Sequence, residues 1–564
     1  MKEIKHLYTE DGARLNGEEY NIYPRPQLRR DSFFSLNGKW LLTYGKGEKI
    51  NINVPYPPES ILSGVFKNMG KDPTLVYTRT FTLPKGFKKD RVILNFGAVD
   101  QICRVYVNGA YVGKNVGGYN HFSFDITSFL AEENTLTVKV SDCLSNKLLP
   151  YGKQRYKRGG MWYTPISGIW QSVWLESVPE EYVKSLRIET NENRAKIYFT
   201  GISSGELTLS TPKGKQKFQI EHGICSITVD SPRLWSPKDP YLYDFTVKAG
   251  QDRVESYLAF RTLEIKTIDT LPRLCLNGEP FFFHGVLDQG YFSDGIYTPA
   301  NPRQYREDIL KMKELGFNTL RKHIKVEPDW FYYECDRLGM IVFQDFVNNG
   351  SYSFLRDTAF PTVLPKKFPE SLMGRSKQQK DLFTDSMQKT VKQLFNHPCV
   401  CYWTIFNEGW GQFDSDKMYE LLRELDKTRF IDSTSGWFKK KLSDIESLHI
   451  YFKPVKIKES DKPIVLSEFG GYSYRVEGHI ANERKNYGYK LYKTREELME
   501  GIRTLYLEQI VPNIKKGLCG SILTQLSDVE DETNGIYTYD RRICKVDKAV
   551  MLEIAEQLAA TNPK

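Results

Sequence analysis

Two glutamates follow apolar segments at positions where a carboxylate needs an explanation. In "HPCVCYWTIFNEGWGQ", residues 397–412, a run of mostly apolar residues from Cys399 to Phe406 leads directly into Asn407, Glu408 and a glycine. In "PIVLSEFGG", residues 463–471, another apolar run reaches Glu468. Burying an unpaired charge costs several kcal/mol. Each carboxylate is therefore either the first solvated residue after a core strand or a group that does chemistry.

A pair of carboxyl groups is suited to the cleavage of a glycosidic bond. One group protonates the leaving oxygen, and the other acts on the opposite face of the sugar as a nucleophile or a base. A separation of about 5–5.5 Å would retain the anomeric configuration through a covalent glycosyl-enzyme. The acid must keep its proton near neutral pH, whereas the nucleophile must stay ionised. We interpret Glu408 and Glu468 as this catalytic pair.

The elements that would position the pair alternate between strands and helices from about residue 266 onward. Eight strands joined by helices predict a (β/α)8 barrel, whose active site lies at the C-terminal ends of the strands. The predicted strands are 281–289, 319–324, 341–346, 399–408, 430–436, 447–452, 463–470 and 520–528. The predicted helices are 301–316, 385–396, 414–427 and 494–517.

Polar residues gather at the predicted C-terminal ends of these strands, which we call the rim. Three of the eight histidines, His284, His323 and His449, are expected there. An ordinary strand end would account for Glu408 alone, because polar side chains favour loops, but it would not account for the whole ring. The rim residues predicted to bind substrate are Asp288, Arg321, His323, Asp345, Asn407, His449, Tyr451, Gln525 and Asp528.

The first half of the chain is predicted to be entirely β. Residues 1–178 contain alternating segments such as 91–115, which includes the hairpin dipeptide Asn108-Gly109, and we expect a jelly-roll sandwich. Residues 179–265 contain short strands with frequent turn signals, which predict an immunoglobulin-like sandwich without a disulfide. Trp162, Trp170 and Trp174 could stack on a sugar, but a core or domain-seam role is favoured.

Composition and charge exclude several other classes of protein. The net charge of +9 comes from scattered residues, and no nucleic-acid-binding motif is found. The sequence shows no signal peptide and no membrane span, so we expect a cytoplasmic protein. The nine cysteines are expected to be free thiols. No zinc-type spacing or phosphate-binding loop is present, and neither a metal nor a cofactor is predicted. A homo-oligomer is left open.

At these residues the chain resembles family 2 of the glycoside hydrolases, the family of bacterial β-galactosidases, β-glucuronidases and β-mannosidases. The resemblance runs through "PISGIWQSVWLE", "LAFRTLEIK", "HGVLDQGY", "LGFNTLRKHIKVEP", "HPCVCYWTIFNEGWGQ" and "LSEFGGYS". It implies a sugar-binding jelly roll over 1–178, an immunoglobulin-like sandwich over 179–265 and a catalytic barrel over 266–564.

The resemblance also implies a role for each matching residue. Glu408 would be the general acid/base and Glu468 the nucleophile. Asn407 would bond the sugar 2-hydroxyl, and Tyr451 would bond the nucleophile. The residues implied to line the sugar subsite are Arg321, His323, Asp288 and His449.

Departures from the family pattern bear on the substrate. The Asn-x-Lys pair with which β-glucuronidases bind the uronate is missing from "DETNGIYTYDRR", and the nearby acidic residues Asp528, Glu530, Asp531 and Glu532 would repel a carboxylate. Strand three offers only Asp345 toward the metal-ligand pattern of the large β-galactosidases. Gly160 stands where those enzymes place an aspartate, which weakens the case for a sugar contact from the first domain.

The sequence therefore predicts a retaining, exo-acting β-glycosidase for a terminal neutral sugar, with β-galactosides first. The alternatives are a β-glucuronidase or β-mannosidase of the same family, or a non-catalytic carbohydrate-binding protein.

Overall fold

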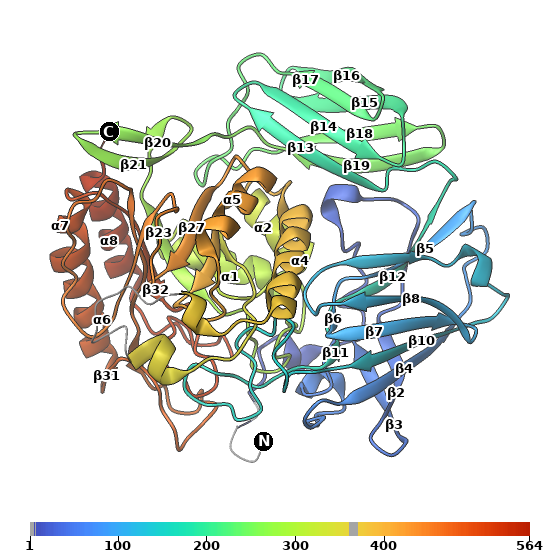
Figure 1. Cartoon of the computed structure of the whole chain (residues 1–564), viewed down its shortest axis with the longest axis horizontal. Helices are drawn as coiled ribbons and strands as arrows, with labels where there is room; N and C mark the ends of the chain where they lie inside the picture. Colours follow the sequence, from blue (N-terminus) through green and yellow to red (C-terminus); the bar gives the residue numbers. More distant parts are fainter. Residues whose placement is uncertain (1–4, 6, 360–369, 564) are drawn as a thin grey trace.

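The computed structural model describes residue 5 and residues 7–359 and 370–563. Three regions follow one another along the chain (Figure 1). The blue strands of the first region lie beside the barrel, which runs from yellow to red, and the green second region lies above them both. The proposed boundary at residue 178 lies at the end of the last strand of the first region, whereas the one at residue 265 falls within the strand Leu263–Ile268, so the second region ends earlier, after the strand Asp252–Leu258.

The first region is a sandwich of antiparallel sheets. The four-stranded sheet has the order β1-β12-β5-β9 and the six-stranded sheet the order β3-β2-β4-β10-β7-β8. Between them lies an apolar core that includes Trp40, Leu94 and Val138. The strands are β1 Phe33–Ser35, β2 Gly38–Tyr44, β3 Glu48–Val54, β4 Thr74–Phe81, β5 Arg91–Phe96, β6 Val99–Asp100, β7 Ile102–Val107, β8 Ala110–Val116, β9 Phe122–Asp125, β10 Asn134–Ser141, β11 Gly168–Ile169 and β12 Val173–Val178.

The predicted hairpin in this region is confirmed. Strands β7 and β8 pair antiparallel across Asn108 and Gly109. Both turn residues have positive φ, 51° and 82°, as the tight hairpin turn that joins twisted strands requires.

The second region is a seven-stranded antiparallel sheet of order β13-β14-β17-β16-β15-β18-β19, folded around its own core. Only Glu221 and Ile224 pair β16 with β17, so the sheet divides there into two layers. The strands are β13 Ser185–Asn191, β14 Arg194–Thr200, β15 Ser204–Thr211, β16 Gly214–Glu221, β17 Ile224–Thr228, β18 Tyr243–Ala249 and β19 Asp252–Leu258.

The third region is an eight-stranded parallel sheet that nearly closes into a barrel, with the order β27-β26-β25-β24-β23-β32-β29-β28. Its strands are β23 Phe283–Asp288, β24 Thr319–Lys322, β25 Ile341–Asp345, β26 Val400–Asn407, β27 Phe430–Ser435, β28 Glu446–Ile450, β29 Ile464–Gly470 and β32 Leu518–Thr524. A small sheet of β20 Leu263–Ile268, β21 Leu271–Leu276 and β22 Glu279–Pro280 precedes it, and β30 Tyr472–Tyr474 pairs with β31 Lys490–Tyr492. Its helices are α1 Arg303–Glu314, α2 Asp329–Leu338, α4 Lys377–Leu394, α5 Ser415–Leu425, α6 Arg495–Thr504, α7 Val511–Ile514 and α8 Lys548–Thr561.

The eight predicted barrel strands are confirmed, and the helices agree less closely. The predicted helix 494–517 is α6, a π-helical turn over Leu505–Ile510, and α7. Helix α2 was not predicted. It buries Glu334 and Asp336 beside Phe331, so its core-facing side is partly polar and the usual helical period of apolar residues is obscured.

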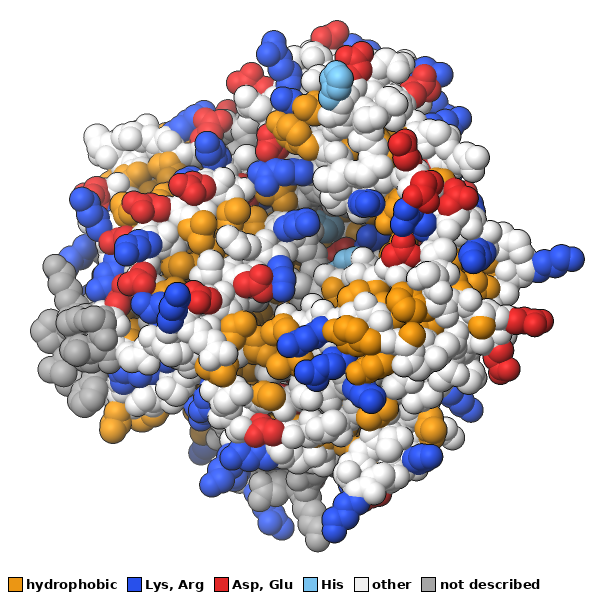
Figure 2. Space-filling view, turned by 45° about the vertical axis from the view of Figure 1, so that its right-hand side comes forward, with side chains coloured by type: hydrophobic (Ala, Val, Ile, Leu, Met, Phe, Trp, Pro, Cys, Tyr) orange, Lys and Arg blue, Asp and Glu red, His pale blue; other side chains and the backbone are white. Residues whose placement is uncertain are grey.

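Two composition-based expectations can be compared with the structure. All nine cysteines are free thiols, as expected. In the described part of the chain, no helix is both long and apolar enough to cross a membrane. Figure 2 shows basic and acidic side chains interspersed over one face of the molecule, around a central hollow.

Candidate active site

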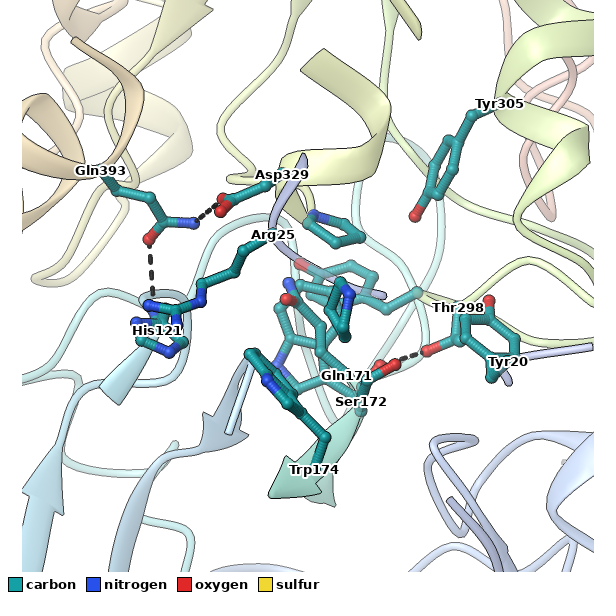
Figure 3. A pocket seen from close by; sticks show the side chains of 15 residues that line it. Tyr20, Arg25, His121, Gln171, Ser172, Trp174, Thr298, Tyr305, Asp329 and Gln393 are labelled. Carbon is teal, nitrogen blue, oxygen red and sulfur yellow. Dashed lines mark hydrogen bonds between the residues drawn. The ribbon is translucent and has the colours of Figure 1, made fainter. Parts of the chain in front are cut away.

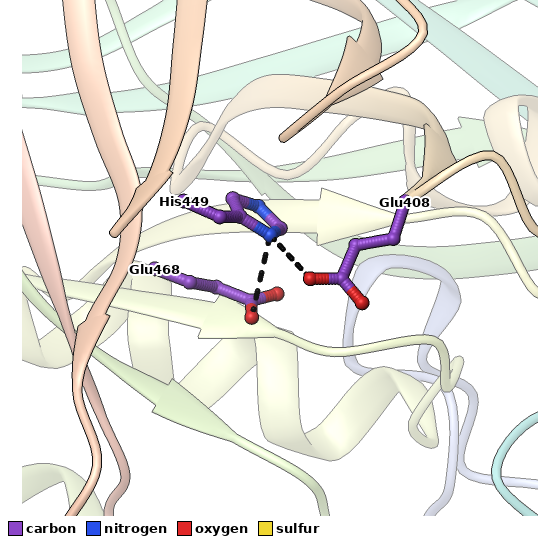
Figure 4. Close-up of side chains that lie close together, drawn as sticks. All are labelled: Glu408, His449 and Glu468. Atoms are coloured by element: carbon purple, nitrogen blue, oxygen red, sulfur yellow. Dashed lines mark hydrogen bonds and ion pairs between the residues drawn. The ribbon is translucent and has the colours of Figure 1, made fainter. Parts of the chain in front are cut away.

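The two predicted catalytic glutamates lie close together at the rim. Glu408 follows β26 and Glu468 lies on β29. His449 lies beside both, with Nδ1 at 2.8 Å from Oε1 of Glu408 and 3.5 Å from Oε2 of Glu468 (Figure 4). The nearest ligand atoms of the three side chains all lie within 4.8 Å of one another. The structure thus brings together two carboxyl groups from strands 60 residues apart in sequence.

A sharp turn at the end of β26 aims Glu408 at this site. The backbone of Glu408 is in the left-handed region at φ 53°, and its N–H donates to the Ser435 carbonyl at 3.0 Å. Gly409 also has positive φ, 71°, and a Cβ there would lie 2.2 Å from the Phe438 ring. This explains why Glu408 is followed by glycine. A non-glycine residue at positive φ is strained, and such strain is concentrated at functional sites.

Glu468 is held as an ionised carboxylate. Arg321 Nη1 donates to its Oε1 at 3.0 Å and the Tyr451 hydroxyl donates to its Oε2 at 2.5 Å. Burial alone would raise the pKa of Glu468, but the charges of His449, Arg321 and His323 and the Tyr451 hydrogen bond lower it to about 2. An ionised, positioned carboxylate beside a second carboxyl group is the arrangement expected of a nucleophile.

Arg321 connects most of the predicted rim residues. Its guanidinium also donates to Asp345 and to Oδ1 of Asn407, at 3.1 and 2.9 Å. Asp345 in turn lies 2.7 Å from Nδ1 of His323. Burial is the main cause that lowers the pKa of His323 to about 4. Six of the predicted substrate-binding residues therefore form one contact network with the two glutamates: Arg321, Asp345, Asn407, His323, His449 and Tyr451.

Three predicted sugar-binding residues make other contacts. Asp288 accepts from Lys322 Nζ at 2.5 Å, and Asp528 accepts from Lys545 Nζ at 2.6 Å. Gln525 donates to Asn534 at 2.8 Å. In the described structure none of these bonds reaches Glu408 or Glu468, and a sugar contact from these three residues stays a prediction.

One residue predicted at the rim is placed elsewhere. His284 stacks on Phe317 at a centroid distance of 4.4 Å and meets the edge of Tyr506. Its strand neighbour Phe283 packs against Phe343 on β25. Because successive side chains on a strand point to opposite faces, His284 faces the surrounding helices rather than the barrel interior, and its inclusion in the rim was wrong.

The acidic residues that follow β32 are buried and bonded rather than exposed on the rim. Glu530 accepts from the Thr164 N–H at 2.8 Å and Asp531 from Arg158 at 2.9 Å. Glu532 accepts from the Tyr163 hydroxyl. These partners belong to one loop of the first region, residues 150–164, which covers the acidic run. The expectation of a free acidic rim was therefore wrong, because each of these carboxylates is buried and bonded.

The same loop brings aromatic residues next to Glu408. Trp162 packs on Trp410 at 5.0 Å and on Tyr352 at 4.9 Å, and Tyr151 also meets Trp410. Trp162, Trp170 and Trp174 are all buried, which confirms their predicted core or seam role. Trp410 was missed, although its place two residues after Glu408 was a signal.

Tyr489 and Lys153 are two further residues near the site that no sequence pattern singles out. Tyr489 stacks on Tyr451 at 3.8 Å with nearly parallel rings, which fixes the phenol that bonds Glu468. Lys153 comes from loop 150–164 and lies over the Trp162 ring at 5.5 Å.

Glu408, His449 and Glu468 are also spaced closely enough to hold a metal ion. We propose no metal there, because Glu468 already accepts hydrogen bonds from Arg321 and Tyr451 on its two oxygens.

A small cavity lies at the seam between the first region and the barrel (Figure 3). His121 and Trp174 line it from the sandwich, and Tyr305 and Asp329 from the barrel. Its volume of about 40 Å³ accommodates little more than a water molecule. It is therefore too small to be a sugar site.

Family models match successive parts of the chain. The sugar binding domain of glycosyl hydrolases family 2 matches residues 23–179, a second family 2 model matches 178–261, and the family 2 TIM barrel domain matches 269–542. Together these cover nearly all of the chain in the order jelly roll, sandwich and barrel.

The similar proteins and solved structures are named for different glycosidase activities. The chain is 24% identical over 480 residues to a beta-galactosidase of Thermoanaerobacter pseudethanolicus, covering 79% of this chain and 60% of the relative. It is 25% identical over 365 residues to a putative beta-glucuronidase of Formosa agariphila, covering 59% and 40%. The chain thus spans about half the length of these relatives. The beta-D-glucuronidase structure from Dictyoglomus thermophilum matches with a TM-score of 0.74 at 19% identity, over 95% of this chain and 98% of that one. Because models of the same family match the three regions in succession, the chain belongs to family 2 of the glycosyl hydrolases.

Proposed function

We propose that the protein hydrolyses terminal β-linked glycosides with retention of anomeric configuration. The observation that carries the proposal is the close approach of Glu408 and Glu468, whose facing carboxyl oxygens lie within 4.8 Å. Separations of about 5 Å suit a nucleophile and an acid/base, whereas inverting enzymes need about 6.5–9.5 Å to admit a water.

The contacts assign a role to each carboxylate. Glu468, kept ionised by Arg321 and Tyr451, attacks the anomeric carbon and forms an ester with the sugar. Glu408 donates its proton to the departing glycosidic oxygen. It then takes a proton from the water that hydrolyses the ester, so both carboxyl groups return to their starting states. Both chemical roles are filled by side chains of this chain.

Asn407 is placed to bind the sugar. Its Oδ1 accepts from Arg321 at 2.9 Å and from the Ser435 hydroxyl at 2.7 Å. Since the oxygen is occupied by these donors, the amide nitrogen is the group available to donate to a sugar hydroxyl. A hydrogen bond to the 2-hydroxyl strengthens in the transition state of glycoside hydrolysis.

An exo-acting specificity is supported by loop 150–164. Its contacts with Trp410 and with Glu530–Glu532 cover one side of the rim. A covered rim suits the end of a sugar chain better than its middle.

A neutral sugar, with β-galactosides first, is the candidate that the sequence favours. The absence of the Asn-x-Lys pair and the relatives named beta-galactosidase still support a neutral sugar. It loses the support of an acidic rim, because those carboxylates are bonded.

A mechanism-based label tests the proposed reaction. A 2-deoxy-2-fluoro glycoside with a good leaving group should form a stable ester on Glu468, found by peptide mapping, and Glu468→Ala should form none. Label on Glu408 instead would reverse the roles, and inversion of the anomeric centre, followed by NMR, would refute the retaining mechanism.

A further inference from the structure

Lys153 is a buried cation with no bonded partner in the described structure. Four lysines are buried among the residues that the structure describes: Lys153, Lys322, Lys325 and Lys545. The other three have carboxylate oxygens 2.5–2.9 Å from Nζ. Lys153 is 8% exposed, and its ammonium group has neither a hydrogen bond nor an ion pair among the described residues. A buried ammonium is costly unless it is paired. Lys153 would therefore be stabilised by an anion, and no described residue supplies one within bonding distance.

The contacts of Lys153 place it over the catalytic rim. Its ammonium lies over the ring of Trp162, which packs on Trp410, two residues beyond Glu408. Its carbonyl accepts from the N–H of Tyr163, whose hydroxyl donates to Glu532 beside Gln525 at the end of β32. Lys153 therefore lies between the end of β26, which carries Glu408, and the end of β32.

Electrostatic effects agree with this position. Burial is the largest cause that lowers the pKa of His323, and the charge of Lys153 lowers it further. His323 itself bonds to Asp345, a partner of Arg321. Lys153 thus acts on the same group of residues that holds Glu468.

Two other cations near the catalytic pair are already engaged. Arg321 is shared among Asp345, Glu468 and Asn407, and Lys322 faces away toward Asp288 and Glu327. Arg155, from the same loop as Lys153, also lies over the Trp162 ring, at 3.9 Å, but its side chain is only half-buried. Among the buried lysines of the described residues, Lys153 is the one left to bind a charged sugar group that enters this site.

A purely structural role for Lys153 is the competing explanation. Glu532 lies close enough to feel its charge: burial raises the pKa of Glu532 to about 7, and Lys153 lowers it. However, Lys153 and Glu532 form no ion pair within 4.0 Å, whereas Glu532 is already bonded to Tyr163 and Gln525. The interaction between Lys153 and Glu532 is therefore long-range, and the ammonium remains free to bind an anion in direct contact.

Building on the proposed glycosidase function, we propose that Lys153 binds the carboxylate of a terminal β-linked uronic acid, so that the first region supplies the cation that reads the sugar's charge. The missing Asn-x-Lys pair is then replaced by a lysine from another domain. This selects a uronide over the neutral sugar that the sequence alone favours.

The test compares 4-nitrophenyl β-D-glucuronide and β-D-galacturonide with the matching glucoside and galactoside. In the unchanged protein, kcat/KM for the better uronide should exceed that of its neutral counterpart at least ~10-fold. Lys153→Met should lower this ratio by about 100-fold, because removing one partner of a buried charge pair strongly weakens binding of the other. Lys153→Arg should retain most of the preference. Lys157→Met, an exposed lysine in the same loop, is the matched control and should leave the ratio unchanged.

The possible outcomes separate this inference from the proposed function. A protein that cleaves only neutral glycosides, or a Lys153→Met variant with an unchanged ratio and native melting temperature, would overturn the role of Lys153. A higher kcat/KM for the 6-phosphate or 6-sulfate of the neutral glycosides would refute the carboxylate. In each case, retention and labelling of Glu468 would leave the glycosidase function intact. Absence of cleavage of every β-glycoside would instead count against that function.

Discussion

At the scale of single residues, the site separates two chemically identical side chains by their surroundings. Glu468 is 8% exposed and bonded by Arg321 and Tyr451, whereas Glu408 is 14% exposed and is bonded by His449. Two carboxyl groups with different environments can serve as nucleophile and acid at one pH. Their surroundings, rather than their residue type, assign the roles.

The proposed role of Glu408 predicts that removing this residue lowers activity by an amount that depends on the leaving group of the substrate. Glu408→Ala should lower kcat/KM for substrates with poor leaving groups by ~10²–10⁴-fold and spare activated aryl glycosides, which need little protonation. Azide should partly restore turnover by attacking the glycosyl-enzyme. Steady-state kinetics with and without azide measure both effects, and Glu424→Ala on the exposed face of α5 is the control. An equal loss for both substrate types, without azide rescue, would remove Glu408 from this role.

The bond from Tyr451 to Glu468 predicts a change in the pH profile. Activity requires ionised Glu468 and is lost as the pH falls through its pKa in the folded protein, which is lowered to about 2. Tyr451→Phe removes one cause of that lowering, so the pKa should rise and the acid limb of kcat/KM should move about 1–2 units to higher pH. Tyr111→Phe, an exposed residue of β8, should not move it. A limb that stays in place would show that this hydrogen bond does not keep Glu468 ionised.

At the scale of an element, β26 depends on the turn that ends it. The strand is buried along its whole length, and only the left-handed backbone of Glu408 and Gly409 redirects the chain toward the site. The direction of a catalytic side chain is thus fixed by two residues at a strand end.

Gly409→Ala is expected to damage this turn. The added Cβ would meet the Phe438 ring at 2.2 Å, in addition to the strain of a φ of 71°. We expect a loss of roughly 1–3 kcal/mol of stability and a lower kcat. Gly250→Ala has φ 55° but no atom within 4 Å of its Cβ, so it isolates the backbone strain. Thermal unfolding and kcat measure the two effects. If both variants lose the same stability, the contact with Phe438 is unimportant.

At the scale of the whole molecule, buried charges connect the regions. Arg30 donates to Glu176 of the first region at 3.1 Å and to Asp252 of the second at 3.0 Å. All three side chains are at most 3% exposed. Loop 150–164 connects the first region to the barrel in the same way, through Arg158 and Tyr163. The sandwiches are therefore attached to the barrel and to each other through specific polar contacts.

Breaking the Arg30 cluster should weaken the assembly of regions. Arg30→Ala leaves Asp252 buried without its cation and leaves Glu176 with Arg25 alone, and breaking a buried ion pair typically costs about 3–5 kcal/mol. Burial would raise the pKa of Glu176, but Arg25 and Arg30 lower it, so this stabilisation is present at neutral pH and is lost as the pH falls. Thermal unfolding at several pH values measures it, with exposed Arg253→Ala as the control. Equal melting temperatures for the two variants at neutral pH would contradict this role.

The architecture and the two candidate catalytic glutamates could be predicted from local patterns in the sequence. Strand faces follow from an alternation with period two, and a carboxylate directly after an apolar run is visible locally, as at Asn407-Glu408 and Glu468. The same alternation explains why Arg321 bonds to Glu468 while its strand neighbour Lys322 bonds to Asp288. These features depend on neighbours a few residues apart, which a sequence displays directly.

Which charged side chains are paired could be seen only in the tertiary structure. Glu530, Asp531 and Glu532 resembled a free acidic rim until a loop more than 360 residues earlier in the chain was found to bond them. Asp528 is likewise paired with Lys545, while Lys153 is left without a partner in the described structure. The free energy of a buried charge depends on what surrounds it in space. The two candidate catalytic carboxylates could therefore be predicted from the sequence, whereas the charges around them depend on how the first region packs on the barrel.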